Sequence, residues 1–169
     1  MISIVLPIYN EEAGLASFIS ELSLELTKIS ENAEVIFVND GSKDNSLALI
    51  KKFCEENKDF KYIDLSRNFG HQIAVSAGID FAKGDKIMLI DSDGQDPPAV
   101  MHQMLAKMDE GYDVVYAQRI KRADESALKK LTAKFFYKFL NKITSIEIPV
   151  DTGDFRIINR KVANALKQM

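Results

Sequence analysis

Short apolar segments alternate with longer helical patterns along most of the chain, and this alternation restricts the possible folds more than any other feature. Buried strands are expected where four or five mostly apolar residues stand between turn-forming or charged residues, at 2–6, 35–38, 62–65, 86–90 and 113–117. Helices are expected where apolar residues recur every three or four positions, over 12–29, 45–56, 71–82 and 98–108. This order predicts an α/β fold with a mainly parallel sheet covered on both faces.

The ends of the predicted helices carry residue types that are typical of helix ends. Asn10 is expected to cap the first helix and Asp44 the second, because their side chains can accept hydrogen bonds from free backbone N–H groups. The pair Pro97–Pro98 suits the start of the fourth helix. Gly84 and Gly111 stand where the third and fourth helices should end.

Composition excludes several classes of protein. The 169 residues are the length of one domain, and the net charge of −3 gives no reason to expect a nucleic-acid partner. Cys54 is the only cysteine, which excludes an internal disulfide framework. A zinc site is not expected either, and His71 and His102 are expected to be structural or exposed, since neither has a visible partner in the sequence. No apolar run approaches the ~20 residues that span a bilayer.

The most informative polar segment follows the fourth predicted strand. Ligands bind beyond the carboxyl ends of strands in open parallel sheets. Asp91 and Asp93 are two residues apart, so in extended chain both carboxylates can face one site. Two such charges ~4 Å apart repel by about 4 kcal/mol at an effective dielectric constant of ~20, and a cation would remove this cost. With Gln95 nearby, the oxygen ligands favour Mg²⁺ or Mn²⁺. A solvated acidic turn, with Asp96 capping the next helix, is the open alternative.

Three further acidic positions have both a functional and a structural interpretation. Asp40 lies in an Asn-Asp-Gly-Ser segment, which is also an ordinary turn sequence. Glu11 is also favourable simply because it is close to a helix N-terminus. Residues 151–156 place two acids and an arginine around a glycine before an apolar strand at 157–158. A turn with a surface ion pair would explain this last segment equally well.

Residues 119–142 have a charge of their own. They contain eight Lys or Arg and two Asp or Glu, a net charge of +6, so the rest of the chain carries −9. The stripe of Lys130, Lys134, Lys138 and Lys142 has helical spacing, and the same segment is rich in Phe. A basic amphipathic helix of this kind can lie on a membrane surface, where each lysine contributes ~1 kcal/mol near anionic lipid. A core helix with one solvated face is the alternative.

Taken together, these motifs resemble glycosyltransferase family 2, and within it the polyprenyl-phosphate glycosyltransferases. They look most like bactoprenol glucosyltransferases and are similar to dolichyl-phosphate mannose synthases. The resemblance is carried, in chain order, by residues 5–12, 38–42, 66–71, 91–98, 112–119 and 151–156. It implies the GT-A fold, a Rossmann-like α/β sandwich that acts on nucleotide-diphospho-sugars.

The resemblance also implies roles for individual residues. The residues expected to bind the donor are Pro7, Tyr9, Glu11, Val38, Asp40, Asp91, Ser92, Asp93 and Arg119. Asp93 and Gln95 are expected to bind Mg²⁺ or Mn²⁺, and Asp154 is the candidate catalytic base or a positioning group. The acceptor and membrane face is expected to include Lys130, Lys134 and Lys138.

The function expected from the resemblance is inverting transfer of a sugar from UDP-glucose or another UDP-sugar to undecaprenyl phosphate. Residues 1–169 are expected to be one catalytic domain without its C-terminal part, from a protein held at the cytoplasmic face of the membrane. Two alternatives stay open. A family 2 enzyme can instead transfer to a sugar hydroxyl of a polysaccharide, and the chain can be a nucleotide-sugar-binding module without catalysis.

Overall fold

The computed structural model describes residues 1–118 and 152–168. By its packing, the chain divides into one unit of Met1–Tyr116 with Asp154–Met169 and another of Ala117–Gly153. The described residues of the second unit are only the ends of two strands. The elements are β1 (Ile2–Ile8), α1 (Glu12–Leu26), β2 (Ala33–Asn39), α2 (Ser46–Glu56), β3 (Phe60–Asp64), α3 (His71–Phe81), β4 (Lys86–Leu89), η1 (Pro98–Val100), α4 (Met101–Asp109), β5 (Val114–Gln118), β6 (Thr152–Asn159) and α6 (Arg160–Leu166).

The six described strands form one sheet in the order β3-β2-β1-β4-β6-β5. The pairs β1–β2, β1–β4 and β2–β3 are parallel, and β6 runs antiparallel to β4. The predicted α/β fold with a mainly parallel sheet is therefore confirmed. The register places Ile8 of β1 opposite Asn39 of β2, and Asn39 opposite Asp64 of β3. The loops that follow these three strands consequently leave the sheet at the same edge.

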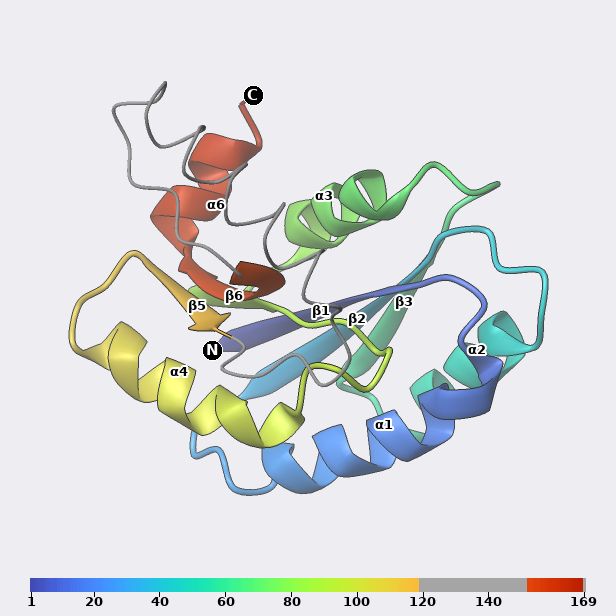
Figure 1. The fold of residues 1–169 in the computed structure, drawn as a ribbon, viewed down its shortest axis with the longest axis horizontal. Helices are drawn as coiled ribbons and strands as arrows, with labels where there is room; N and C mark the ends of the chain where they lie inside the picture. Colours follow the sequence, from blue (N-terminus) through green and yellow to red (C-terminus); the bar gives the residue numbers. More distant parts are fainter. Residues whose placement is uncertain (119–151, 169) are drawn as a thin grey trace, which may run out of the picture. The chain divides into compact units, whose positions relative to one another are not determined.

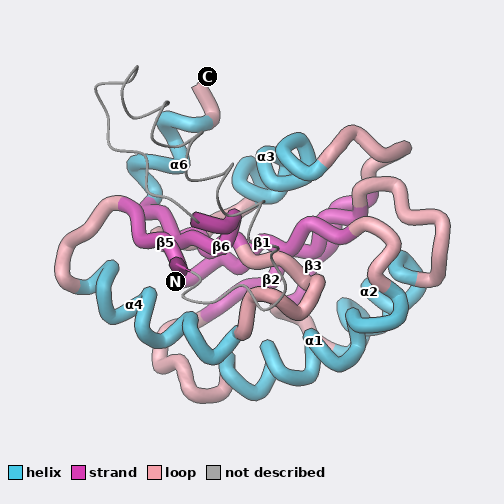
Figure 2. Tube along the Cα trace, viewed as in Figure 1, coloured by secondary structure: helices cyan, strands magenta, loops and turns pink. Residues whose placement is uncertain are grey.

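Helices cover both faces of this sheet, as Figures 1 and 2 show: α3 and α6 lie on one face, and α1, α2 and α4 on the other. On the α3 face, Val5 of β1, Val38 of β2 and Leu89 of β4 form one buried cluster with Ala74 and Ile79 of α3. All seven residues of β1 are buried, as expected for a strand with helices on both sides. Each fully buried Val, Leu or Ile side chain of this strand contributes ~1.5–3 kcal/mol to the free energy of folding.

Asn10, which was predicted to cap the first helix, instead links the loops after β1 and β2. Asn10 does not cap α1, because the residue before the helix is Glu11, and no side chain caps it from that position. Asn10 instead takes a left-handed backbone conformation, with φ of 56°, and its Oδ1 accepts a hydrogen bond from Lys43 N at 2.8 Å. Asn tolerates this conformation better than most residues. The predicted Asn10 cap is therefore wrong, and Asn10 joins the two loops instead.

The N-termini of α1 and α2 cap each other. The carboxylate of Asp44 accepts hydrogen bonds from Ser46 N in α2 and from Glu12 N in α1, both at 3.0 Å. In return, Glu12 Oε2 accepts from Asn45 N at 2.7 Å. The N-cap position of α2 is Asn45 rather than the predicted Asp44, but Asp44 does accept a hydrogen bond from the first N–H group of that helix. Its second bond, to α1, is a contact between residues far apart in sequence. Free N–H groups at both helix ends are satisfied in this way.

Most predicted helix ends are confirmed within a few residues. The first helix ends at Leu26 rather than at 29, and η1 begins at Pro98 directly before α4. Gly111 follows α4 with φ of 99°, the left-handed conformation typical of a helix end. Among the described residues, no helix has the length and apolar character needed to cross a membrane.

Gly78 allows α3 to pack closely on β1, and its replacement provides the first test. A Cβ at this position would overlap Val5 Cγ1 and lie 3.2 Å from Val38 Cγ2. Overpacking of this kind costs about 1–3 kcal/mol, so Gly78→Ala is expected to lower the free energy of unfolding by that amount in urea denaturation. The control is Gly14→Ala in α1, where a Cβ has nothing within 4 Å and Ala should be neutral or stabilising by up to about 1 kcal/mol. Equal stability of the two variants would contradict the packing.

Candidate active site

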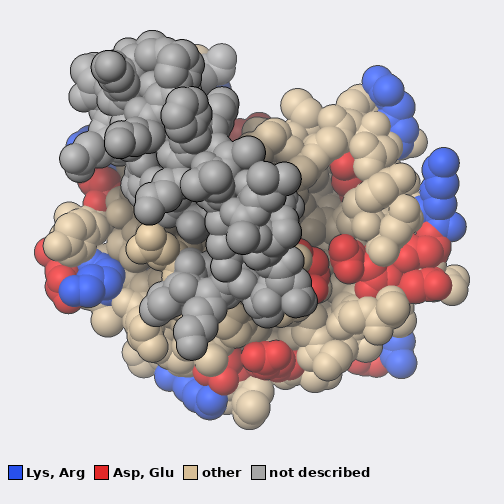
Figure 3. All heavy atoms as spheres, in the orientation of Figure 1, with Lys and Arg blue, Asp and Glu red and all other residues tan. Residues whose placement is uncertain are grey.

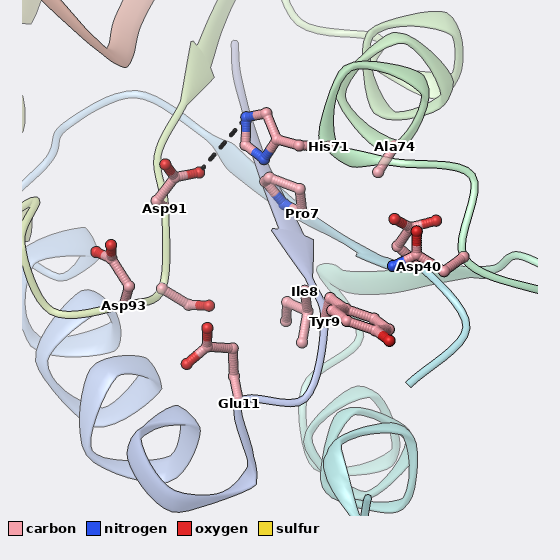
Figure 4. A pocket seen from close by; sticks show the side chains of 11 residues that line it. Pro7, Ile8, Tyr9, Glu11, Asp40, His71, Ala74, Asp91 and Asp93 are labelled. Carbon is pink, nitrogen blue, oxygen red and sulfur yellow. Dashed lines mark ion pairs between the residues drawn. The ribbon is translucent and has the colours of Figure 1, made fainter. Parts of the chain in front are cut away.

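A pocket opens at the carboxyl edge of the parallel strands, where the loops after β1, β2 and β4 meet the start of α3 (Figure 4). Its position follows from the shared register of the strand ends, and it matches the place where open α/β sheets bind ligands. The side chains that line it come from segments up to 86 residues apart: Pro7, Ile8, Tyr9, Glu11, Asp40, Asn68, His71, Ala74, Asp91, Ser92 and Asp93.

The structure brings together seven of the residues expected to bind the donor, namely Pro7, Tyr9, Glu11, Asp40, Asp91, Ser92 and Asp93. Val38 does not line the pocket, because its side chain is buried in the cluster under α3. Gln95 and Asp154 are not among the lining residues, although Asp154 contacts one of them. Four expected site residues lie outside the described part of the chain: Arg119, Lys130, Lys134 and Lys138.

The pocket is acidic, and the pKa of two of its carboxyl groups is raised by burial and by neighbouring carboxylates. Burial raises the pKa of Asp91 to about 6, an effect that His71 opposes and that nearby carboxylates, including Asp93 and Asp154, reinforce. Burial also raises the pKa of Glu11, and the charge of Asp93 adds to this. On the face shown in Figure 3, acidic side chains gather on the side of the view where α1 and α2 begin. A site with this charge would be stabilised by a cation.

The sequence left two interpretations open for the acidic segment after β4, a cation site and a solvated turn, and the structure has features of both. Ser92 is buried and only 28% of the Asp91 side chain is exposed, so this part is not a solvated turn. Asp93 is exposed, and its Oδ1 accepts a hydrogen bond from Gln95 N at 2.9 Å, which is the geometry of an Asx turn. The backbone turn therefore presents the Asp91 and Asp93 side chains to the pocket (Figure 4).

His71 was missed as a site residue by sequence reasoning. Its Nε2 lies 3.2 Å from Asp154 Oδ2 and 3.9 Å from Asp91 Oδ1. These three side chains offer ligand atoms that all lie within 4.8 Å of one another. His102 also has a partner, Glu25 Oε2 at 2.7 Å, which joins α4 to α1. The His71 side chain is 38% exposed, which agrees with the expectation, but it also contacts two carboxylates, from the loop after β4 and from β6, that the sequence did not reveal.

The described part of the 151–156 segment, residues 152–156, lies in β6 and does not form the turn that was the alternative. Asp154 and Arg156 lie in β6, two residues apart, with Arg156 Nη1 3.7 Å from Asp154 Oδ1. The expected ion pair between Asp154 and Arg156 is therefore present, but it lies on β6, next to the pocket, rather than in a turn. The other oxygen of Asp154 faces His71.

Asp40 holds the loop that precedes α3. Its carboxylate is buried, and it accepts hydrogen bonds from Phe69 N at 2.7 Å and from Gly70 N at 3.0 Å. The two loops approach so closely that a Cβ at Gly41, whose φ is 65°, would lie 2.6 Å from Asn68 N. The alternative for Asp40 was an ordinary turn. In the structure, its carboxylate also fixes a loop that is distant in sequence. Asn68 also lines the pocket; it lies in the 66–71 motif, but no role was assigned to it from the sequence.

Two solved structures share this fold. The crystal structure of residues 1–349 of TarS from S. aureus aligns with a TM-score of 0.61 at 21% identity, over 99% of this chain and 48% of that one. Glucosyl-3-phosphoglycerate synthase from Mycobacterium tuberculosis, in complex with Mn²⁺, UDP and glucosyl-3-phosphoglycerate, aligns with a TM-score of 0.68 at 19% identity, over 96% of this chain and 57% of that one. The fold is that of the GT-A glycosyltransferases, as expected from the sequence.

Sequence comparison gives the family within this class. The profile of Glycosyl transferase family 2 matches residues 3–167, and the chain belongs to this family. An uncharacterized glycosyltransferase of Bacillus subtilis (strain 168) is 48% identical over 99% of this chain and 52% of that protein. A prophage bactoprenol glucosyl transferase homolog of Escherichia coli (strain K12) is 38% identical over 99% of this chain and 55% of that protein. The chain thus spans about half the length of these relatives.

The role of Asp40 in the loop is tested by Asp40→Ala. Without the carboxylate, the N–H groups of Phe69 and Gly70 lose their acceptor, so the free energy of unfolding should fall by about 1.5–3 kcal/mol. Amide hydrogen exchange at these two residues should become faster. Asp64→Ala is the control, because this exposed carboxylate accepts a side-chain bond, from Asn39 Nδ2, rather than backbone bonds from a loop, and its loss should cost less. Unchanged exchange at Phe69 and Gly70 would contradict the assignment.

The raised pKa of Asp91 predicts how stability depends on pH. Because its pKa is about 6 in the folded protein and 3.8 ordinarily, the folded state binds more protons between these values. This carboxyl group therefore adds stability as the pH falls from 7 to 4. At pH 7, Asp91→Asn should be more stable than the parent chain, because Asn carries no buried charge. This difference in the free energy of unfolding should shrink by about 2–3 kcal/mol between pH 7 and pH 4, as measured by urea denaturation. Asp59→Asn, at an exposed position, is the control. A pH-independent difference between Asp91→Asn and the parent chain would refute the burial of this charge.

Proposed function

We propose that this chain is the catalytic domain of an inverting glycosyltransferase that transfers a hexose from a nucleotide-diphosphate sugar to a polyprenyl phosphate. The donor is UDP-glucose or another UDP-sugar, and the acceptor is undecaprenyl phosphate. The observation that carries the proposal is the convergence of Glu11, Asp91 and Asp93 at the carboxyl edge of a GT-A sheet. The names of the relatives support the acceptor, since several at 36–38% identity are bactoprenol glucosyl transferases.

The pocket is suited to a nucleotide. Pro7 and Tyr9 provide apolar and aromatic surface next to the buried carboxylate of Asp40, which suits a base and its polar edge. Asp91 would accept hydrogen bonds from ribose hydroxyls. The diphosphate would then lie towards Asp93, and Arg119, outside the described residues, is proposed to contact it.

The residues present fit a divalent cation. Glu11, Asp91 and Asp93 offer hard oxygen ligands, and burial together with neighbouring carboxylates raises the pKa of Glu11 and of Asp91. We propose that Asp93 and Gln95 hold Mg²⁺ or Mn²⁺. A bound ion of this kind neutralises charge on a diphosphate leaving group.

The proposed reaction forms one bond and breaks another. A phosphate oxygen of the acceptor attacks the anomeric carbon from the face opposite the leaving group, and the bond from that carbon to the nucleoside diphosphate breaks with its electron pair. Inversion at the anomeric carbon follows. By analogy with phosphoamino acids, whose second pKa is ~6, the acceptor is mostly ionised at pH 7. A strong base is then unnecessary, and Asp154 orients the acceptor or takes the residual proton.

The membrane side of the proposal concerns residues 119–142, which lie outside the described residues. Their net charge of +6 complements an anionic membrane surface and the phosphate of the acceptor. We propose that Lys130, Lys134 and Lys138 face this surface, at the cytoplasmic side where nucleotide sugars are made.

The proposal is tested by a panel of UDP-glucose, other UDP-sugars and GDP-mannose with undecaprenyl phosphate in detergent micelles and Mn²⁺. Mass spectrometry should detect a lipid-phosphate-sugar from one UDP-sugar. Asp93→Ala should reduce transfer by at least a hundredfold, whereas Asp154→Asn should reduce it only about tenfold. Asp59→Ala, which removes an exposed carboxylate remote from the pocket, is the matched control and should retain full activity.

Three outcomes would contradict the proposal. A product with an alkali-stable glycosidic bond would indicate a sugar hydroxyl acceptor. Calorimetry that shows binding of UDP-sugar without transfer to any acceptor would indicate a binding module. Full activity of Asp93→Ala would refute the role of this residue in metal binding.

A further inference from the structure

We propose that His71 is a positioning residue that holds the carboxylate of Asp154 against the pocket. The inference deepens the proposed function, on which it rests, because it explains how a residue on β6 reaches a site built mainly by β1, β2 and β4. His71 lines the pocket and Asp154 does not, so the imidazole is the observed link between them.

The strand register brings the two carboxylates together. β6 is antiparallel to β4, with Leu89 opposite Arg156. Continued by two residues in each direction, this register places Asp91 opposite Asp154. Side chains at opposed positions lie close to each other in antiparallel pairs. The two negative charges repel, and nothing in this pairing alone would keep the Asp154 carboxylate beside Asp91.

The imidazole lies where it can offset this repulsion. Nε2 is 3.2 Å from Asp154 Oδ2 and 3.9 Å from Asp91 Oδ1, so one ring nitrogen faces both carboxylates. Within the described ranges, this buried Nε2 has no aligned hydrogen bond. With a proton on Nε2 it can donate to Asp154, and catalytic hydrogen bonds that are poorly aligned without substrate often tighten when substrate binds.

The position of His71 is itself fixed by the backbone. It is the first residue of α3, and the preceding Gly70 has φ of 98°. Asp40 accepts hydrogen bonds from the N–H groups of Phe69 and Gly70, which anchors the loop directly before His71. The backbone that carries the imidazole is therefore anchored by the loop after β2 and by α3, independently of β6. It can act as a fixed point for the Asp154 side chain.

A competing partner shows why a fixed point is needed. Arg156 Nη1 lies 3.7 Å from Asp154 Oδ1, on the same strand and two residues further along. Asp154 is 41% exposed, so its carboxylate has room to move. Without His71, we expect the carboxylate to turn towards Arg156 and solvent, away from Asp91.

The inference is tested by a double-mutant cycle on the transfer reaction. His71→Ala should lower kcat by about the same factor as Asp154→Asn, roughly tenfold, with the KM for the donor changed less than twofold. The variant with both substitutions should be no slower than either single variant. His71→Gln, whose amide can still donate a hydrogen bond, should recover part of the activity. His102→Ala is the matched control, because it removes an imidazole that pairs with Glu25 instead.

A second measurement reports the contact without any reaction. In long-range ¹H–¹⁵N spectra, Asp154→Asn should shift the Nε2 resonance of His71 and leave that of His102 in place. This result can be obtained even if no acceptor is found, so failure of the proposed function is distinguishable from failure of the inference. Three results would overturn the inference. The losses in the double-mutant cycle could be multiplicative, or His71→Ala could raise the donor KM with kcat unchanged. The third is a His71 resonance that does not shift in Asp154→Asn.

Discussion

The parallel pairing of β1 with β2 and β4 is the constraint on which the rest of this structure depends. Since the three strands run in the same direction, the loops after β1, β2 and β4 leave the sheet at one edge. Glu11, Asp40 and Asp91 follow these strands and would be far apart in an extended chain. The buried apolar faces of the strands supply the free energy that holds these acidic groups near one another. The repulsion among the acidic groups is the cost of this arrangement, and it creates a site that favours a cation.

Much of this could be predicted from local sequence patterns. The strands are short apolar runs and the helices have apolar residues at helical spacing, so the element order and the parallel sheet follow from residues that are close in sequence. The rule that ligands bind beyond strand ends also pointed to Tyr9, Asp40 and Asp93. In contrast, Asn10 was expected to cap α1, and its actual partner, Lys43, could not be identified without the packing of the two loops.

His71 shows most clearly where sequence reasoning ends. Its neighbours in sequence are apolar or neutral, so nothing local indicates a carboxylate partner. His71 and Asp154 are 83 residues apart in sequence. The antiparallel pairing of β6 with β4 brings them into contact. Val38 is the opposite case, because it lies within a motif of the family, yet its side chain is buried under α3. Family motifs thus combine residues that contact the pocket with residues that support it from behind.

We propose that this acidic edge of the sheet binds a nucleoside diphosphate. Amide chemical-shift mapping by NMR, with UDP added in the presence of Mg²⁺, tests it most directly. The largest changes are expected at Tyr9, Glu11, Asp40 and residues 91–93, and they should require the cation. The opposite edge of the sheet has its own hollow, lined in part by Ser23, Asn32 and Phe60. Shifts concentrated there, or no shifts at saturating UDP, would contradict the account.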